Sequence, residues 1–333
     1  MLDSPFVLFI YKSFYIYQQD EQPIVPPLFS TGLKLSAQLV VNMLIRQGFD
    51  VKLVEAKDQN SIQELVSHYR PDRVVLEAIW VTPTKMQELV AANPNVRWVV
   101  RVHSELPFLA NEGMAVGWIA SYMKLGVQIA FNSSQTVRDF VVMGTAAYLP
   151  NYYPQQSGTS RSFQTATVNV GCFGSIRPLK NQLIQAFAAI AYASKIGRKL
   201  IFNMNGARVE QSGANNLKNI KALFDATGEV LVLHSWHNHD HFLKLVASMD
   251  ICLGVSLSES FCITAADAVS QGVPFVGSEA IKWLPFESQA PVDNMEGIVR
   301  VMEKAHRYVK KNTRALESFS NRSARIWSEW MDS

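Results

Sequence analysis

Apolar residues follow a helical period in some stretches of the chain and form short unbroken runs in others, and the two kinds of stretch alternate. After a first apolar run at 6–11, five apolar residues share one helical face: Leu35, Leu39, Val40, Met43 and Leu44. Gly48 then ends the predicted helix, and VKLVEA at 51–56 predicts a strand. This part of the chain is therefore predicted as a β-α-β unit.

The same alternation continues along the chain. Up to residue 150 it predicts helices at 62–69, 86–93 and 114–126, and strands at 72–80, 97–104 and 127–133. From residue 168 it predicts strands at 168–175, 199–206, 229–236, 250–257 and 274–278, and helices at 181–197 and 241–249. Strands that alternate with helices at this spacing favour parallel, doubly wound α/β sheets.

A polar stretch with two prolines and little periodicity, PNYYPQQSGTSRSFQTAT, separates the two sets of strands. We therefore predict Rossmann-like domains at 1–150 and 168–310, a linker at 151–167, and a final helix at 311–333 that packs back toward the first domain. Parallel sheets of this kind bind ligands at the carboxyl ends of their strands, so the two domains are expected to face each other across a cleft.

Composition agrees with a two-domain globular protein. The chain has 333 residues, of which 48% are hydrophobic, enough for a large core. No apolar run reaches the roughly 18 residues of a membrane span. The apolar stretch PFVLFIYKSFYIY lacks a preceding basic segment, so we expect no signal peptide and a cytoplasmic protein, in a bacterial host if the protein is viral. Three cysteines without metal-like spacing, Cys172, Cys252 and Cys262, are expected to be reduced thiols.

Charge is unevenly distributed. The net charge is +3, but residues 1–150 hold 12 Lys+Arg against 13 Asp+Glu, which is not typical of a surface that neutralises many phosphates. Near the end of the chain, basic residues at spacings of four and three predict one basic face of a helix: Arg300, Lys304, Arg307, Lys311 and Arg314. Such a face could follow nucleic-acid phosphates or an anionic membrane, or could simply be solvated.

Two carboxylates stand eight residues apart where a predicted strand meets a helix, in the stretch SLSESFCITAADAVSQGVP. Glu259 and Asp267 are suited to sugar binding because a carboxylate accepts two hydrogen bonds from neighbouring hydroxyls. The backbone N–H groups of 261–264, at a helix start, could bind a diphosphate. The alternative interpretation is structural: Thr264 and Asp267 would form a capping box, and Glu259 would be a solvated loop residue.

The stretch ESFCITAAD, followed by Gly272, Val273 and Pro274, resembles the Glu-x7-Glu signature of retaining GT-B glycosyltransferases, the group 1, glycogen synthase-like branch. Asp267 stands where the family has the second Glu. The resemblance implies that Glu259 lies near the donor sugar and that Asp267 holds the ribose. It assigns the diphosphate to the intervening turn: Ser260, Phe261, Cys262, Ile263 and Thr264.

The stretch VGCFGSIRPLKNQLIQAF resembles the family segment in which an Arg and a Lys neutralise the leaving diphosphate. Lys180 stands at the Lys position. Ser175 occupies the usual Arg position, and Arg177, two residues on, is expected to substitute for it. Gly174 is expected to lie at the donor, and two cations beside a leaving group would stabilise its developing charge. The alternative is two surface cations before a helix.

The resemblance extends to the neighbouring segments. It places the nucleotide base near Ser235 and Trp236 and the phosphates near Gly206. Three alternating histidines follow: His237, His239 and His241. A metal site there is not favoured, because residues spaced by two do not share one helical face.

In the first domain the resemblance implies that His103 faces the reacting centre and that Gly32 lies near the donor phosphates. A buried, hydrogen-bonded histidine is the structural alternative for His103. The acceptor site is expected to include the loop carrying Tyr15 and Tyr17, together with Glu77 and Glu105.

The resulting hypothesis is a retaining glycosyltransferase of the GT-B fold that uses a nucleotide-sugar, a UDP-linked hexose, and no cofactor. No Asp-X-Asp motif occurs, so we expect transfer without a divalent metal. The compact size resembles phage-type enzymes that modify 5-hydroxymethylcytosine in duplex DNA, and bacterial enzymes with saccharide or lipid-linked acceptors share the same motifs. Both acceptors stay open, as does a non-catalytic protein that only binds a nucleotide-sugar.

Overall fold

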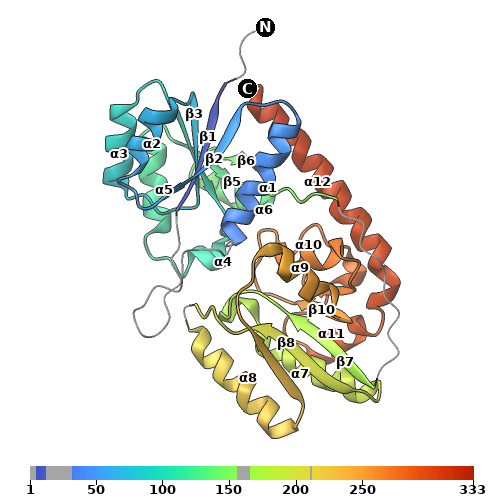
Figure 1. Ribbon diagram of the computed structural model, residues 1–333. Coiled ribbons are helices and arrows are strands. Elements are labelled where there is room, and N and C mark those ends of the chain that lie inside the picture. Colours follow the sequence, from blue (N-terminus) through green and yellow to red (C-terminus); the bar gives the residue numbers. More distant parts are fainter. Residues whose placement is uncertain (1–4, 13–31, 156–165, 211) are drawn as a thin grey trace. The chain divides into compact units, whose positions relative to one another are not determined.

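The computed structural model describes residues 5–12, 32–155, 166–210 and 212–333. The chain forms two compact units, which are described separately (Figure 1). Unit 1 comprises Met1–Pro154 together with Phe319–Ser333, and unit 2 comprises Gln155–Ser318. The unit boundary therefore falls inside the last helix, whose carboxyl-terminal half belongs to unit 1.

Unit 1 contains a parallel sheet with the strand order β2-β1-β3-β4-β5-β6. The strands are β1 (Val7–Lys12), β2 (Val51–Ala56), β3 (Arg73–Glu77), β4 (Arg97–Val102), β5 (Gln128–Phe131) and β6 (Ala147–Tyr148). The helices are α1 (Gly32–Arg46), α2 (Ile62–Tyr69), α3 (Pro83–Ala92), α4 (Leu106–Leu109), α5 (Ala115–Lys124) and α6 (Ser134–Asp139), with a 3-10 turn η1 (Phe140–Val142). β1 lies inside the sheet, with β2 on one edge and β3 on the other.

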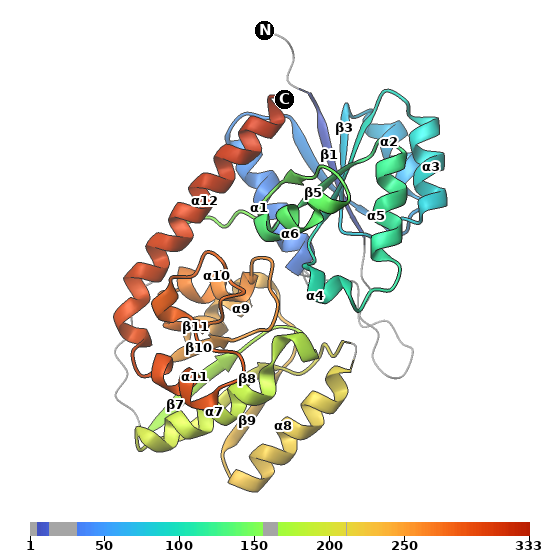
Figure 2. The ribbon, with the colours of Figure 1, turned by 180° about the vertical axis from the view of Figure 1, so that it is seen from behind.

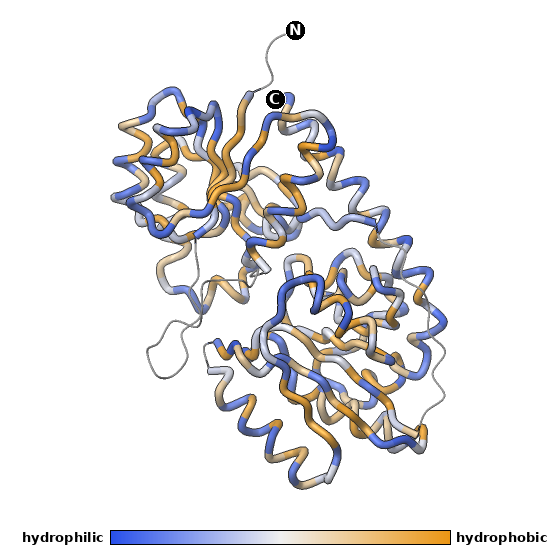
Figure 3. The backbone as a smooth tube through the Cα atoms, viewed as in Figure 1, coloured by the Kyte–Doolittle hydropathy of each residue, from blue (hydrophilic) through white to orange (hydrophobic). Residues whose placement is uncertain are grey.

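Helices cover both faces of this sheet (Figures 1 and 2). Successive residues of β1 point to opposite faces: Val7 and Phe9 pack with α1, whereas Leu8 and Ile10 pack with the side chains of α2, α3 and α5. A strand buried on both faces has no polar alternation, which explains the unbroken apolar runs in the sequence. Figure 3 shows these strands as continuous hydrophobic segments.

The last helix, α12 (Val309–Met331), contributes to a hydrophobic core of unit 1. Trp327 is fully buried, its ring centroid lies 5.7 Å from that of Phe9, and its indole N–H donates to the carbonyl of Pro150 at 2.7 Å. The carbonyl of Trp330 accepts from the guanidinium of Arg73 at 2.9 Å. Segments more than 170 residues apart in sequence are thus fixed to one another.

Unit 2 contains a parallel sheet with the strand order β11-β10-β7-β8-β9. The strands are β7 (Thr167–Cys172), β8 (Lys199–Asn205), β9 (Val230–His234), β10 (Ile251–Gly254) and β11 (Phe275–Gly277). The helices are α7 (Gln182–Lys195), α8 (Gly213–Thr227), α9 (His239–Ala247), α10 (Ile263–Ser270) and α11 (Met295–Met302), with 3-10 turns η2 (Pro178–Lys180), η3 (Phe286–Ser288) and η4 (Ala305–Tyr308). The core packs the alanine-rich face of α7 against alternate residues of β7 and β8.

The predicted fold class is confirmed: both units are doubly wound α/β structures with parallel sheets. The predicted basic helix at 300–314 is wrong. Arg300 lies in α11, Arg307 in η4, and Lys311 and Arg314 in α12, so the helical spacing that seemed to align them is interrupted twice. The structure also adds α8, which the apolar pattern did not reveal.

Cys172, Cys252 and Cys262 are buried free thiols. Within the described ranges, no helix has both the length and the apolar character that a membrane crossing needs.

Trp327→Ala should lower the free energy of unfolding by about 3 to 5 kcal/mol, because it removes a buried aromatic side chain and leaves the Pro150 carbonyl without its donor. Urea unfolding measures the change. Arg325→Ala, on the exposed face of the same helix, should change stability by less than about 0.5 kcal/mol. Equal losses in the two variants would show that α12 is not part of the core of unit 1.

Candidate active site

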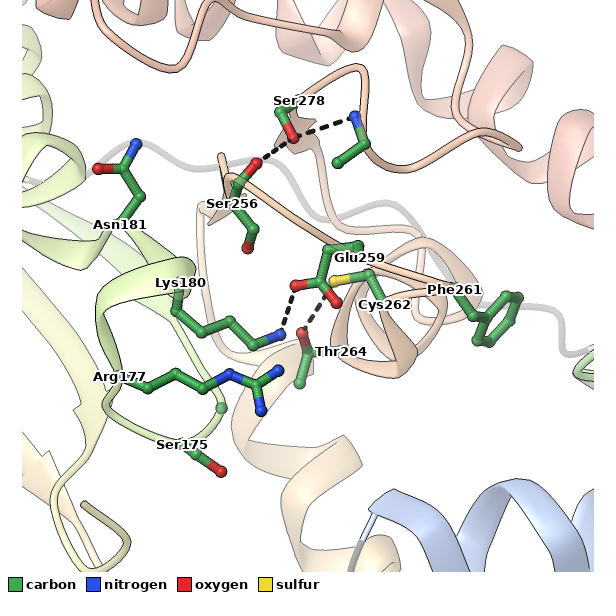
Figure 4. Close-up of polar contacts among 12 residues, drawn as sticks. Ser175, Arg177, Lys180, Asn181, Ser256, Glu259, Phe261, Cys262, Thr264 and Ser278 are labelled. Atoms are coloured by element: carbon green, nitrogen blue, oxygen red, sulfur yellow. Dashed lines mark hydrogen bonds and ion pairs between the residues drawn. The ribbon is translucent and has the colours of Figure 1, made fainter. Parts of the chain in front are cut away.

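An ion pair between Lys180 and Glu259 lies at the carboxyl edge of the sheet in unit 2 (Figure 4). Lys180 ends η2, which follows β7, and Glu259 lies in the loop that follows β10, the neighbouring strand. The side chains are only 14% and 7% exposed. Two residues 79 positions apart in the sequence are therefore brought together by the order of the strands.

Both members of this pair stay charged. Burial opposes the ionised form of each group, but the attraction between them outweighs it, so that the pKa of Glu259 is lowered and the pKa of Lys180 is raised. Removing either partner would leave a buried, uncompensated charge. The carboxylate of Glu259 is therefore suited to accept hydrogen bonds rather than to act as an acid.

Side chains of α7 hold the Lys180 loop in place. Asn181 adopts a left-handed conformation (φ 57°) and donates to the carbonyl groups of Val255 and Val292. Gln185 donates to the carbonyl of Lys180 at 2.8 Å and accepts from the N–H of Val255 at 2.9 Å. The two loops that carry the ion pair are thereby joined to each other through a buried helix face.

Arg177 provides a second cation beside Lys180. In Figure 4 its guanidinium extends alongside the Lys180 ammonium, and its charge contributes to the lowered pKa of Glu259. Its Nη1 lies 3.3 Å from Glu210, which also binds Arg208 at 2.5 Å. Ser175 offers only a hydroxyl nearby. The structure thus puts Arg177 beside Lys180, and its substitution for the family arginine stays a prediction.

Gly174 and Gly206, both predicted to lie at the donor, are required by the structure for different reasons. Gly174 has a φ of 117°, its N–H donates to Asn205 at 2.9 Å, and it lies next to the Lys180 side chain. A Cβ on Gly206 would approach the Cβ of Leu233 to 2.9 Å, so β9 leaves no room for a side chain there. Gly206 is thus explained by packing alone, and its relation to a phosphate stays a prediction.

The start of α10 carries no side-chain cap. Its N-cap residue is Cys262, whose φ of 63° is left-handed, and its thiol contacts the hydroxyl of Thr264 at 3.5 Å. Asp267 lies one turn inside the helix, where its carboxylate faces His239. The capping-box interpretation of Thr264 and Asp267 is therefore wrong. The uncapped backbone N–H groups and the positive end of the helix dipole favour an anion at the start of α10.

The remaining predicted donor residues differ in exposure. Phe261 is buried and its carbonyl accepts from the indole of Trp283 at 2.7 Å, so its side chain supports the turn from inside. Ser260 and Ile263 are half-buried. Ser235 is exposed and Trp236 half-buried in the loop after β9, where the guanidinium of Arg208 lies 5.6 Å from the Trp236 ring centroid.

In unit 1, His103 belongs to a buried polar network at the carboxyl ends of the strands. Its Nε2 lies 2.5 Å from Glu77, and its Nδ1 lies 3.4 Å from the amide of Asn132. Because an amide nitrogen only donates, Nδ1 accepts and Nε2 carries the proton. Burial and the charge of Arg101 lower the pKa of His103 despite the opposing effect of Glu77, so that the ring is neutral at pH 7.

Together with Asn132 and Asn151, the sequence analysis missed Arg101, the charged partner of Glu77 in this network. Both oxygens of Glu77 accept from its Nη1, its Nε donates to the carbonyl of Leu149 at 2.9 Å, and its Nη2 donates to Asn151 at 2.6 Å. Its guanidinium also lies over the Trp327 ring. The sequence did contain a sign of this role, because Arg101 lies within the apolar strand RWVVRV, and a buried charge needs a buried partner.

The structure places the other predicted residues of this region as follows. Glu77, predicted for acceptor binding, is fully buried with both oxygens bonded to Arg101. Glu105 accepts from the hydroxyl of Ser133 at 2.6 Å. Gly32 is the first residue of α1. Tyr15 and Tyr17 lie outside the described residues.

In the described part of the chain, no group of three or more His, Cys, Asp or Glu residues could hold a metal ion. Of the three alternating histidines, His239 pairs with Asp267 at 2.7 Å, whereas His241 is exposed.

Comparisons with known proteins were made at the levels of sequence and structure. No protein-family model matches the sequence, and neither does any curated protein. Solved structures do match. Sucrose-phosphate synthase from Thermosynechococcus elongatus has a TM-score of 0.68 at 10% identity, over 97% of this chain and 98% of that one. HepE from Anabaena, in complex with UDP and glucose, has a TM-score of 0.61 at 12% identity, over 96% and 95%.

The chain has the GT-B fold. TarM of S. aureus, in a structure containing UDP, matches with a TM-score of 0.59 at 12% identity over 78% of this chain. The match spans only 55% of the TarM chain. At such identities the likeness concerns the fold, and the chemistry has to be argued from the residues of this chain.

The left-handed backbone of Cys262 predicts that glycine is favoured there. Cys262→Gly should be about 1 kcal/mol more stable than Cys262→Ala, because a Cβ is strained at this φ. Urea unfolding of both variants tests this. At Cys252, in a regular strand, the order should be reversed. A more stable alanine at both positions would contradict the strained turn.

The pair of His239 and Asp267 predicts a pH-dependent contribution to stability. Burial opposes protonation of His239, but the hydrogen bond and charge of Asp267 outweigh it, and the pKa is raised. The contribution is therefore complete below the ordinary pKa of about 6.5 and is lost as the pH rises through the raised value. Urea unfolding of the wild type and His239→Gln between about pH 5 and about pH 9 should show a difference that shrinks with pH. A constant difference would contradict it.

Proposed function

We propose that the protein is a retaining glycosyltransferase that moves a sugar from a nucleotide-sugar, a UDP-linked hexose, to an acceptor hydroxyl. The observation that carries the proposal is the buried pair of Lys180 and Glu259 beside the start of α10. The GT-B fold supports it, since the matching structures of HepE and TarM contain UDP.

The leaving diphosphate is assigned to the cations and the helix start. Lys180 and Arg177 would stabilise the charge that builds on the departing phosphate oxygens, and the amides at the start of α10 would add hydrogen bonds. These groups would supply the electrostatic stabilisation that a divalent ion gives in other transferases. We therefore propose that transfer is independent of divalent metal.

Glu259 is assigned to the donor sugar. Its lowered pKa keeps it ionised, so it would accept hydrogen bonds from sugar hydroxyls while Lys180 holds its position. Attack from the face of the leaving group would retain the anomeric configuration, and a phosphate oxygen of the leaving group would take the acceptor's proton. This scheme needs no side chain as a general base.

Two acceptors fit the proposal: 5-hydroxymethylcytosine in duplex DNA, and a saccharide or lipid-linked glycan. Both present a primary or secondary hydroxyl to the same donor chemistry. A protein that binds the nucleotide-sugar without transferring it is the alternative of another class, because Ser175 and Asp267 depart from the family pattern. The same assay separates all three.

Glu259→Gln and Lys180→Met should each lower kcat/KM by about 10² to 10³, because each removes charge stabilisation and leaves its partner buried and unpaired. A panel of nucleotide-sugars is incubated with the protein, with and without a duplex containing 5-hydroxymethylcytosine, in the presence of EDTA. Released nucleotide and DNA mass are followed. The matched control replaces the exposed pair: Glu287→Gln and Lys311→Met should keep full activity.

A hexosyl gain on the duplex would identify the DNA acceptor, and donor hydrolysis without a DNA product would move the acceptor to saccharide or lipid. Turnover that EDTA abolishes would refute metal independence. Binding of a nucleotide-sugar without turnover under any of these conditions would establish the binding protein instead.

A further inference from the structure

Asp267 and His239 form a pair between two helices of unit 2 that the proposed function has not yet used. Asp267 lies on α10, and His239 is the first residue of α9, which packs against α10. The Nε2 of His239 lies 2.7 Å from an oxygen of Asp267. Residues 28 positions apart thus form one polar unit.

The two side chains differ in access to solvent. The Asp267 side chain is 2% exposed, whereas that of His239 is 20% exposed. Nε2 is committed to Asp267, and among the described residues Nδ1 of His239 has no hydrogen-bond partner. The atom through which this unit can reach a ligand is therefore an imidazole nitrogen, and the carboxylate stays behind it.

The position of His239 suggests which part of a nucleotide it meets. It follows Trp236 by three residues in the segment after β9, and its partner Asp267 lies one turn from the start of α10. If the aromatic ring takes the base and the helix start takes the diphosphate, the group between them is the ribose, because a nucleoside diphosphate joins its parts in that order.

We propose that His239, held by Asp267, hydrogen-bonds a ribose hydroxyl of the bound nucleotide. This assignment rests on the proposed function and replaces the direct contact that the sequence had suggested for Asp267. The imidazole supplies the reach that the short, buried carboxylate lacks. With Nε2–H donating to Asp267, Nδ1 accepts from a hydroxyl, and a protonated ring would donate to the same oxygen. Asp267 is then a positioning residue.

Calorimetric titration with UDP, 2′-deoxy-UDP and 3′-deoxy-UDP tests the proposal. The wild type should bind UDP about tenfold more tightly than at least one of the deoxy forms. His239→Ala should weaken UDP binding about tenfold and bind the deoxy form equally well. His241→Ala, two residues away and exposed, should behave as the wild type. Asp267→Asn, which can still accept from Nε2–H, should lose less affinity and keep the preference for ribose.

The opposite pattern would overturn the proposal. If Asp267 bound the ribose itself, His239 would compete with the ribose for the carboxylate. His239→Ala would then bind UDP at least as tightly as the wild type and keep the preference for UDP over its deoxy forms. Asp267→Asn would lose that preference. Circular dichroism checks that each variant folds. If His239→Ala does not fold, His239→Phe, which keeps an aromatic ring without nitrogen, replaces it in the titration. If no nucleotide binds the wild type, the proposed function itself is wrong, and this assignment is wrong with it.

Discussion

The buried pair of Lys180 and Glu259 is the constraint around which the site in unit 2 is organised. Neither charge could remain ionised alone at that depth, because desolvation works against both. Together they keep a carboxylate and an ammonium in fixed positions at the edge of the sheet. The loops that carry them must then be rigid, and Gln185 and Asn181 provide that rigidity by bonding each loop to buried backbone groups.

The same principle recurs in unit 1. Glu77 and Arg101 are fully buried, and their burial is offset by the bonds that they make. The carboxylate of Glu77 bonds to the guanidinium and to His103, and the guanidinium also donates to Leu149 and Asn151. Trp327 covers the network from α12. The last helix therefore contributes more than apolar area, since its Trp327 ring also packs against a buried guanidinium.

Unit 2 also shows how a site can be built on strain. Asn181 and Cys262 both adopt left-handed backbone conformations, and each immediately precedes a helix whose start borders the ion pair. A non-glycine residue is held in that region at a cost, which the surrounding packing has to offset.

The sequence by itself determined the elements and their class. A strand buried on both faces, such as β1, appears as an unbroken apolar run. The edge strand VKLVEA at 51–56 was also predicted, with the bounds that β2 has. The stretch around Glu259 likewise predicted the strand, turn and helix on which Glu259 and Asp267 lie. These properties depend on neighbouring residues and the period of one element, which is why local patterns suffice.

Tertiary structure alone decided the partners. The pairs of Asp267 with His239 and of Arg177 with Glu210 join residues about 30 positions apart, and they form because strand order, which no local period encodes, brings particular loops together. The wrong prediction of a single basic helix at 300–314 arose because a local pattern was followed where packing decided the structure. No glycine or proline marks the breaks after Met302 and before Val309, so a regular spacing of basic residues suggested one helix where packing produces three separate elements, α11, η4 and α12.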